Sequence, residues 1–496
     1  MRWTLIVIFF FCICAPCLAG KYVYDYDSNC SKAYQYYMSL QLEKGKEAIS
    51  DELKVQPCNL MAAYVNDYED CLSLLFSGNK KDYEQRKGHF DERMDILDRG
   101  DESSPWYRFC KAGVNLHWAL VYFRFGENVK AAFTFRKAFL LIKENERLFP
   151  DLEYNKVYSG FVETVTGTIP DNYKWVASIF GLKGSVKKGA ALLSAFIDTH
   201  SNNDLMQAEA IIYYLYLRFY FLSEKDAAWD YVNGNNFPVS ANAMYVFVKA
   251  NLAVNYRKAD MAIQTLDEAE KNNSYSQFPV FDLEMGSALL YKQDTNCLFY
   301  FQRFLKNTKG TAFIKDTWQM MGLMYYIQGK MPNARYCKEY IKTHGSAITD
   351  ADKQAERFSE TAQWPDKTLL QAHLLIDGGY YAQALDKLKT VNEGSFHSTA
   401  DKLEYLFRMG RVYEELKDTN KAFQYYQATI NLGKDRPEHF AARSALQMAF
   451  IYEKMGKEKE AIEKYEEVLG MHGHDLQASI DQQAKAGINR LTAKRS

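Results

Sequence analysis

The chain has 496 residues, of which 47% are hydrophobic and 25% charged. This length exceeds a single domain of about 100–150 residues, which predicts several domains or a repeat array, and the ordinary composition excludes wholesale disorder and a multi-span membrane protein. Lys plus Arg (61) nearly cancels Asp plus Glu (62). Without a basic field to hold phosphate backbones, we expect no nucleic-acid partner.

Residues 1–19 are typical of a cleavable signal peptide. Arg2 precedes an apolar stretch that runs from Leu5 to about Cys17 and ends in small residues up to Ala19, the pattern that a signal peptidase recognises. An uncleaved anchor is the competing interpretation, but Leu5 to Ala19 falls short of the roughly 20 residues of a membrane span. We expect export, to the periplasm or cell envelope if the source is bacterial and otherwise into the secretory pathway.

The remaining chain carries no apolar run of the roughly 18 residues that would indicate a membrane span. We therefore expect no span in the mature chain and at most a peripheral membrane contact. Six cysteines remain after cleavage: Cys30, Cys58, Cys71, Cys110, Cys297 and Cys337. An oxidising compartment would allow disulfides, but buried free cysteine is the expectation we favour. No paired-cysteine spacing supports a structural metal.

A repeated pattern of small and aromatic residues organises most of the sequence. Trp318-x2-Met321-Gly322-x2-Tyr325 follows the tetratricopeptide pattern W-x2-L-G-x2-Y. Two C-terminal segments share one spacing: Gly410, Tyr413, Ala422 and Tyr426, then Ala449, Tyr452, Ala461 and Tyr465. Small residues let two helices approach and aromatic rings fill the seams. In-register copies from about 104 to 470 predict an all-α fold, a right-handed superhelical solenoid of tetratricopeptide-type helical hairpins.

The regularity of this pattern defines the predicted domains. Divergent N-terminal helical hairpins are expected over 20–103, with helices at 33–38, 40–53, 60–76 and 83–97. Helical repeats follow over 104–345, with a non-repeat insert at 158–196, and C-terminal tetratricopeptide repeats occupy 346–474. A capping helix is expected over 475–496, because its apolar residues have helical spacing: Leu476, Ile480, Ile488 and Leu491.

Glycine punctuates the insert at 158–196. A phosphate-binding loop would need G-x4-G-K-[ST], and Gly184 is instead followed by Ser185-Val186. The run from Trp175 to Phe180 could contact a bilayer as a short amphipathic element. Such a run is more often a core helix wedged between hairpins, and that is the interpretation we favour.

The same segment resembles a named family. A start at Gly160-Phe161, then Ile169-Pro170, an apolar helix, and Phe180-Gly181-Leu182-Lys183-Gly184 with Gly189 are similar to the hallmark of the tetratricopeptide repeat protein 39 and inclusion body clearance family. Here leucine replaces the family's aromatic residue and lysine its arginine. The resemblance covers roughly 105–345 and implies an α-helical scaffold without a shared catalytic residue. Because relatives of that type are mostly intracellular, it implies no partner for a chain predicted to be exported.

No catalytic motif occurs in the sequence. H-E-x-x-H, G-x-S-x-G and G-x-G-x-x-G are all absent. The closest pair of histidines, His472-Gly473-His474, lies in a predicted loop and is interpreted as a surface turn. We therefore predict that the protein is not an enzyme and uses neither a cofactor nor a metal. An enzyme with an unrecognised site in the insert has no positive feature in its favour.

The predicted function follows from the surface of the repeats. First helices of stacked hairpins line a concave groove that binds extended peptides or partner helices. Groove positions of the last two repeats hold arginines and aromatic residues, types enriched at binding hot spots: Phe407, Arg408, Arg411, Arg443, Gln447 and Phe450. We expect a non-catalytic interaction scaffold for a protein or peptide partner. The competing interpretation for these residues is packing within the superhelix, and the alternative function is a cell-surface or periplasmic receptor for a small ligand such as a glycan, whose sugars would stack on aromatic rings.

Overall fold

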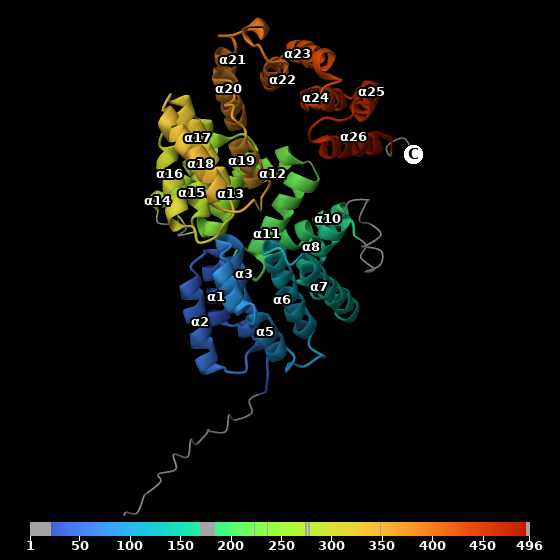
Figure 1. The fold of residues 1–496 in the computed structure, drawn as a ribbon. Coiled ribbons are helices and arrows are strands. Elements are labelled where there is room, and N and C mark those ends of the chain that lie inside the picture. The colour runs from blue at the N-terminus through green and yellow to red at the C-terminus, as the bar shows by residue number, and fades with distance from the viewer. Residues whose placement is uncertain are drawn as a thin grey trace, which may run out of the picture. The chain divides into compact units, whose positions relative to one another are not determined.

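A computed structural model describes residues 21–168, 184–222, 224–235, 237–272, 275, 278–347 and 349–492. The predicted signal peptide and the run from Trp175 to Phe180 lie outside these residues. The chain divides into two compact units, Met1–Tyr245 and Val246–Ser496. Within the described residues the elements are helices, and sheet-type pairing is confined to one isolated bridge between Val23 and Asn59. The predicted all-α class is confirmed (Figure 1).

The N-terminal unit is built from helices of 7 to 21 residues. Their bounds are α1 Ser28–Met38, α2 Leu42–Val55, α3 Leu60–Ser77, α4 Lys80–Arg86, α5 His89–Leu97, α6 Pro105–Arg124, α7 Asn128–Leu148, α8 Asn155–Gly167, α10 Val186–Ile197, α11 Gln207–Tyr216 with a π-helical end at Leu217–Phe221, α12 Lys225–Asn233 and a 3₁₀ turn at Val239–Ala241. Local sequence explains several starts. Ser104 caps α6 through its side chain and Pro105 occupies the first turn, where a missing N–H costs nothing.

The C-terminal unit continues the series of hairpins. Helix α13 Ala243–Asn255 begins in the last residues of the N-terminal unit and continues into this one. The elements that follow are α14 Ala259–Lys271, α15 Val280–Tyr291, α16 Cys297–Asn307, α17 Ile314–Ile327, α18 Met331–Thr343, α19 Asp350–Glu360, α20 Lys367–Gly378, α21 Tyr381–Leu388, a 3₁₀ turn Glu393–Ser395, α22 Thr399–Glu415, α23 Thr419–Gly433, α24 Phe440–Lys454, α25 Glu458–Leu469 and α26 Gln477–Thr492. Neighbouring helices pack as antiparallel pairs, such as α17 with α18 and α24 with α25 (Figure 1). The predicted solenoid of helical hairpins is confirmed.

Small residues bring the paired helices together as the repeat pattern predicts. A Cβ added to Gly410 on α22 would lie 2.6 Å from the ring of Tyr426 on α23, so that ring occupies the space a side chain would need. Ala422 and Tyr426 are fully buried, as are their counterparts Ala461 and Tyr465 in the next hairpin. This division of small and large residues lets the two helix axes approach closely.

Glycines in the insert have the same role. Helix α8 packs against α10, and a Cβ on Gly189 would lie 2.6 Å from the backbone oxygen of Gly160. The two backbones are therefore nearly in contact, which only glycine allows at these positions. Residues 169–183, which carry most of the resemblance to the tetratricopeptide repeat protein 39 family, lie outside the described residues.

Two details predicted from the sequence are wrong, one helix and one buried position. The single helix expected at 83–97 is two helices, α4 and α5, separated at Lys87 and Gly88. In the cap, Ile480 and Leu491 are buried as expected, but Leu476 is 51% exposed. Leu476 has φ of 61° and precedes α26, so the turn into the helix points its side chain away from the apolar face.

Every cysteine of the described chain is a free thiol, in agreement with the expectation. Cys58 is half-buried and the other five are buried. Among the described helices, none combines the length and the apolar character that crossing a membrane requires.

Candidate binding site

A cavity of about 800 Å³ lies within the C-terminal unit. Its walls come from α17, the segment after α19, α20, α22 and α24. Helix α22 contacts both α20 and α24, so first helices of successive hairpins border one surface. Asp366 fixes the start of α20 by accepting hydrogen bonds from the backbone N–H groups of Thr368 and Leu369. Cavities of this size accommodate peptide segments or small molecules.

The cavity brings together most of the groove residues predicted from the sequence. Phe407, Arg408, Arg411, Arg443 and Gln447 line it. Phe450 does not; its ring lies 5.9 Å from that of Tyr465 in an edge-on contact within the hydrophobic core of the last repeats. Whether the lining residues bind a ligand stays a prediction.

Arg411 is paired with acidic residues of its own unit. Its Nη1 donates to Glu414 Oε2 at 2.6 Å and to Gln447 Oε1 at 2.9 Å, and its Nη2 donates to Glu415 Oε1 at 3.0 Å. The side chain is buried, which disfavours its charge, yet Tyr426 and the two glutamates raise its pKa above the ordinary value. Arg411 therefore ties α22 to α24 and has little capacity for a ligand.

Two further arginines of the cavity, Arg408 and Arg257, are also paired with carboxylates. Arg408 Nε donates to Glu404 Oε1 at 2.7 Å, one helical turn earlier. Arg257 Nη1 lies 3.3 Å from Glu415 Oε1, and its Nε lies 3.9 Å from Asp377 Oδ1. His373 Nε2 approaches Asp377 at 3.0 Å. Burial opposes the Asp377 charge, but His373, Arg257 and Arg408 together lower its pKa to about 2.

Arg443 differs from these three. Its guanidinium has no hydrogen bond or ion pair to any residue that the structure describes. Burial is the first cause that lowers its pKa, and the positive charges of Arg411 and Arg257 are the second. A partly buried cation among cations is costly unless an anion neutralises it. Arg443 is therefore the lining residue best placed to receive an anionic group.

Aromatic rings form the apolar part of the wall. Phe407 lies 5.6 Å from Phe440, and His439 lies 4.5 Å from Phe440, measured between ring centroids. On another side, Trp364 stacks on Tyr326 at 4.8 Å, and Tyr326 donates to the backbone oxygen of Pro365. The ammonium of Lys338 lies 5.0 Å from the Trp364 ring and donates to the backbone oxygen of Gln363. Trp364 is thus fixed before any ligand arrives.

Sequence reasoning missed this second group of lining residues. Phe358 lies near the end of α19 and Trp364 in the connection to α20, and neither was among the groove positions taken from the repeat register. His439 precedes α24 and Arg257 follows α13, so both also fall outside the helical positions used to define the groove. The signal available in the sequence was the Trp364-Pro365 pair. Proline disfavours a helical conformation for the residue before it, so Trp364 is expected in an extended connection between helices.

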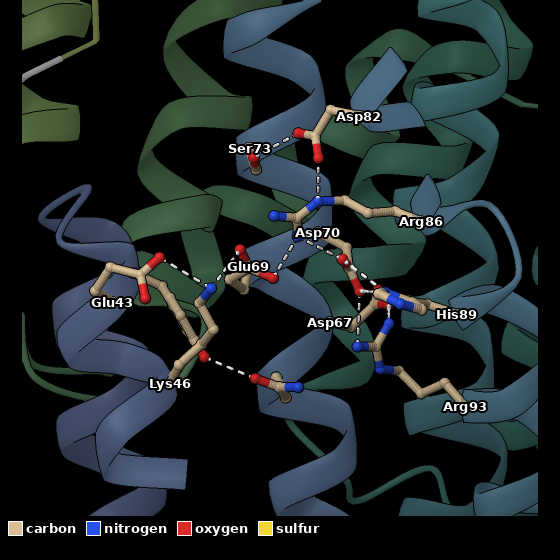
Figure 2. Close-up of polar contacts among 12 residues, drawn as sticks. Glu43, Lys46, Asp67, Glu69, Asp70, Ser73, Asp82, Arg86, His89 and Arg93 are labelled. Carbon is tan, nitrogen blue, oxygen red and sulfur yellow. Dashed lines mark hydrogen bonds and ion pairs between the residues drawn. The ribbon is translucent and has the colours of Figure 1, made fainter. Parts of the chain in front are cut away.

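A second concentration of charge lies in the N-terminal unit, on helix α3. Figure 2 shows Asp67 and Asp70 facing Arg93 and His89 of α5, while Glu69 lies toward Lys46 of α2. Arg93 donates to Asp67 at 2.6 Å and to Asp70 at 2.8 Å. Arg86 of α4 donates to Glu69 at 2.6 Å and to Asp70 at 2.8 Å. The carboxylates of α3 are therefore paired with cations from three other helices.

The same network continues into the core. His117 Nδ1 lies 2.7 Å from Asp67 Oδ2, and its Nε2 lies 3.7 Å from Glu209 Oε1. Burial disfavours the imidazolium, but Asp67 and Glu209 together raise the pKa of His117 to about 9. Tyr68 donates to Glu209, and its hydroxyl lies 3.1 Å from that of Tyr64. Because these groups are buried and mutually paired, the cluster braces the helices rather than presenting a site.

Comparisons with known proteins identify the repeat type in one segment. Residues 404–432, which cover most of α22 and of α23, match the tetratricopeptide repeat family. No curated protein matches the chain. Among solved structures, a chain of the APC/C hetero-tetramer Cut9–Hcn1 is 14% identical, with 94% of this chain and 89% of that chain covered at a TM-score of 0.30. That score is too low to carry any feature of the Cut9–Hcn1 assembly to this protein.

Proposed function

We propose that this protein is an exported, non-catalytic scaffold that binds a protein or peptide partner through the concave side of its C-terminal repeats. The observation that carries the proposal is the cavity between α20, α22 and α24, in which arginines and aromatic rings lie together. Tetratricopeptide-type repeats generally serve protein–protein interaction, and their first helices supply the binding surface. Export is proposed from the sequence of residues 1–19.

The composition of the wall favours a polypeptide ligand. Arginine and aromatic residues dominate the energetics of protein interfaces, and both kinds border the same cavity here. Arg411 and Arg408 are already neutralised by glutamates, so their alkyl stems and the rings of Phe407 and Phe440 offer an ordered surface. An ordered surface loses little side-chain entropy on binding, which favours affinity.

A capture experiment tests this function. The mature chain from Gly20 would be used to capture proteins from the native envelope or secretory fraction, beside the variant Arg443→Glu. Arg411→Glu is a poor choice because it would place a third carboxylate beside Glu414 and Glu415. Lys459→Glu is the matched control, since Lys459 is 83% exposed, lies on α25 and does not border the cavity.

The expected result is one protein captured by the wild type and by Lys459→Glu but lost with Arg443→Glu. Equal capture by all three chains would place binding outside the cavity and contradict the proposed groove. If no protein is captured, the scaffold function loses its support and the glycan receptor becomes the function to test, with a glycan array as the measurement.

A further inference from the structure

One arginine of the cavity has no acid within ion-pair distance among the described residues. Arg257, Arg408 and Arg411 each have a carboxylate within ion-pair distance. Arg443 has none among the described residues, although it lies on the same wall. Every other arginine of the cavity is thus paired with a carboxylate of the chain itself. The guanidinium of Arg443, with its several N–H donors, remains available to a ligand. A carboxylate fits this donor group in a bidentate geometry.

The surroundings of Arg443 restrict the charge that a ligand can bring. Asp377, Asp401 and Glu404 also line the cavity, so a doubly charged phosphate would meet three carboxylates but only one unpaired cation. A single carboxylate neutralises Arg443 without a large excess of negative charge. The adjacent pair Phe407 and Phe440 offers a place for an apolar side chain next to that carboxylate.

The protonation of His439 depends on the charges around Arg443. The groups that act on it are Arg443 of α24, Arg408 and Glu404 of α22, and Asp475 of the segment before α26. Burial lowers the pKa of His439 below its usual value, and the charge of Arg443 is the next cause. A carboxylate on Arg443 would cancel that repulsion and raise the pKa. By linkage, the imidazole then takes up a proton when the anion binds.

Resting on the proposed function, we propose that the cavity takes one carboxylate of a partner peptide on Arg443, with the neighbouring apolar side chain against Phe407 and Phe440. Because His439 lines the same cavity, we expect it to gain a proton when the carboxylate binds. Burial still lowers its pKa in the complex, so affinity then rises as pH falls below the ordinary histidine value of about 6.5, by at most about tenfold per pH unit for one proton. The carboxylate has two sources in a polypeptide, an acidic side chain or the chain terminus, and the experiment separates them.

The test uses the full mature chain and four synthetic peptides in a glycine–serine background. One carries Asp beside Phe and an amidated end, and in the second Asn replaces Asp. The third has no acidic side chain but a free carboxyl terminus after Phe, and the fourth has phosphoserine in place of Asp. Isothermal titration calorimetry in two buffers of different ionisation enthalpy measures both affinity and proton uptake.

The inference expects the Asp peptide or the terminal-carboxylate peptide to bind, with about 10- to 100-fold loss in the Asn peptide and the same loss with Arg443→Gln. Lys459→Gln should bind as the wild type does. His439→Asn should retain affinity at pH 7.5 but lose proton uptake. Because Arg443 has no partner within the described residues, its replacement removes no internal ion pair, and an unchanged circular dichroism spectrum confirms folding.

Three results would overturn the inference. These are equal binding of the Asp and Asn peptides, tighter binding of the phosphoserine peptide than of either carboxylate peptide, and no binding of any peptide to the wild type. None of them contradicts the scaffold function if the capture experiment still yields a partner. Conversely, failure to capture a partner contradicts the function whatever the peptides do.

Discussion

Arg93 on α5 and Asp67 on α3 form an ion pair of 2.6 Å in which neither side chain is more than 9% exposed. Asp67 also contacts His117 at 2.7 Å and accepts a hydrogen bond from the indole of Trp118 at 3.0 Å. One fully buried carboxylate thus joins three elements, α3, α5 and α6. Its charge is tolerated only because each oxygen has a donor.

Replacing Arg93 with methionine should destabilise the N-terminal unit by about 3–5 kcal/mol, because Asp67 and Asp70 would remain buried without their main cation. Denaturant unfolding followed by circular dichroism measures this, and hydrogen exchange should localise the loss to α3 and α5. Lys54→Met is the control: it removes an exposed pair with Asp51 and should cost less than about 1 kcal/mol. Equal effects of the two variants would contradict the bracing role.

His117 should make the stability of the N-terminal unit depend on alkaline pH. Its pKa is raised to about 9 in the folded state, from an ordinary value of 6.5, so the fold binds this proton more tightly than the unfolded chain does. The stabilisation is complete below about pH 6.5 and is lost as pH rises through about 9. It amounts to something on the order of 3 kcal/mol.

Unfolding free energies at several values between pH 6 and 9.5 test this dependence. His117→Gln is the comparison, since glutamine keeps a hydrogen bond to Asp67 but does not titrate. The difference in free energy between the two proteins should shrink as pH rises through about 9, which separates His117 from the lysines and tyrosines that titrate nearby in pH. A constant difference over this range would rule out a protonated His117.

The hairpins could be predicted because small and large residues recur at the fixed spacing that close packing of two helices requires. Gly410 and Tyr426 are a local pair within one hairpin, and the contact follows directly from the repeat. The break between α4 and α5 had no such signal. There, Arg86 and Arg93 turn toward the acids of α3, and those long-range pairs are not visible as a periodicity.

The cavity could be predicted only in part for the same reason. The register of the repeats predicted that Arg411 and Arg443 lie on one side of the groove, and both border the cavity. It could not show that Arg411 is neutralised while Arg443 is not, because that depends on Glu414, Glu415 and their distance from the guanidinium. Nor could it place Trp364, which reaches the cavity from a connection between helices.

Gly410→Ala should destabilise the α22–α23 hairpin by about 1–3 kcal/mol. The new methyl group would lie 2.6 Å from two carbons of the Tyr426 ring, which is fully buried and whose hydroxyl donates a hydrogen bond to Glu414. Hydrogen exchange of α22 and α23 measures the effect locally. Gly88→Ala is the matched control, since a Cβ there meets no atom within 4 Å and its φ of −72° suits alanine.

That control should be neutral or stabilising by up to about 1 kcal/mol, because alanine restricts the unfolded chain. Unchanged exchange in α22 and α23 of the Gly410→Ala protein would mean that the helices can separate at no cost, contrary to the close packing seen between Gly410 and Tyr426.

Thiol reactivity should follow burial across the cysteines. Cys58 is half-buried, whereas Cys30, Cys71 and Cys110 are buried, and burial raises the pKa of each of these three thiols. Only the thiolate reacts rapidly with alkylating agents. Brief treatment of the folded mature chain with iodoacetamide should therefore modify Cys58 first, as peptide mass mapping would show.

All six should react in denaturant without a reducing agent, because each is a free thiol. Protection of a pair until a reductant is added would reveal a disulfide and contradict the free-thiol assignment.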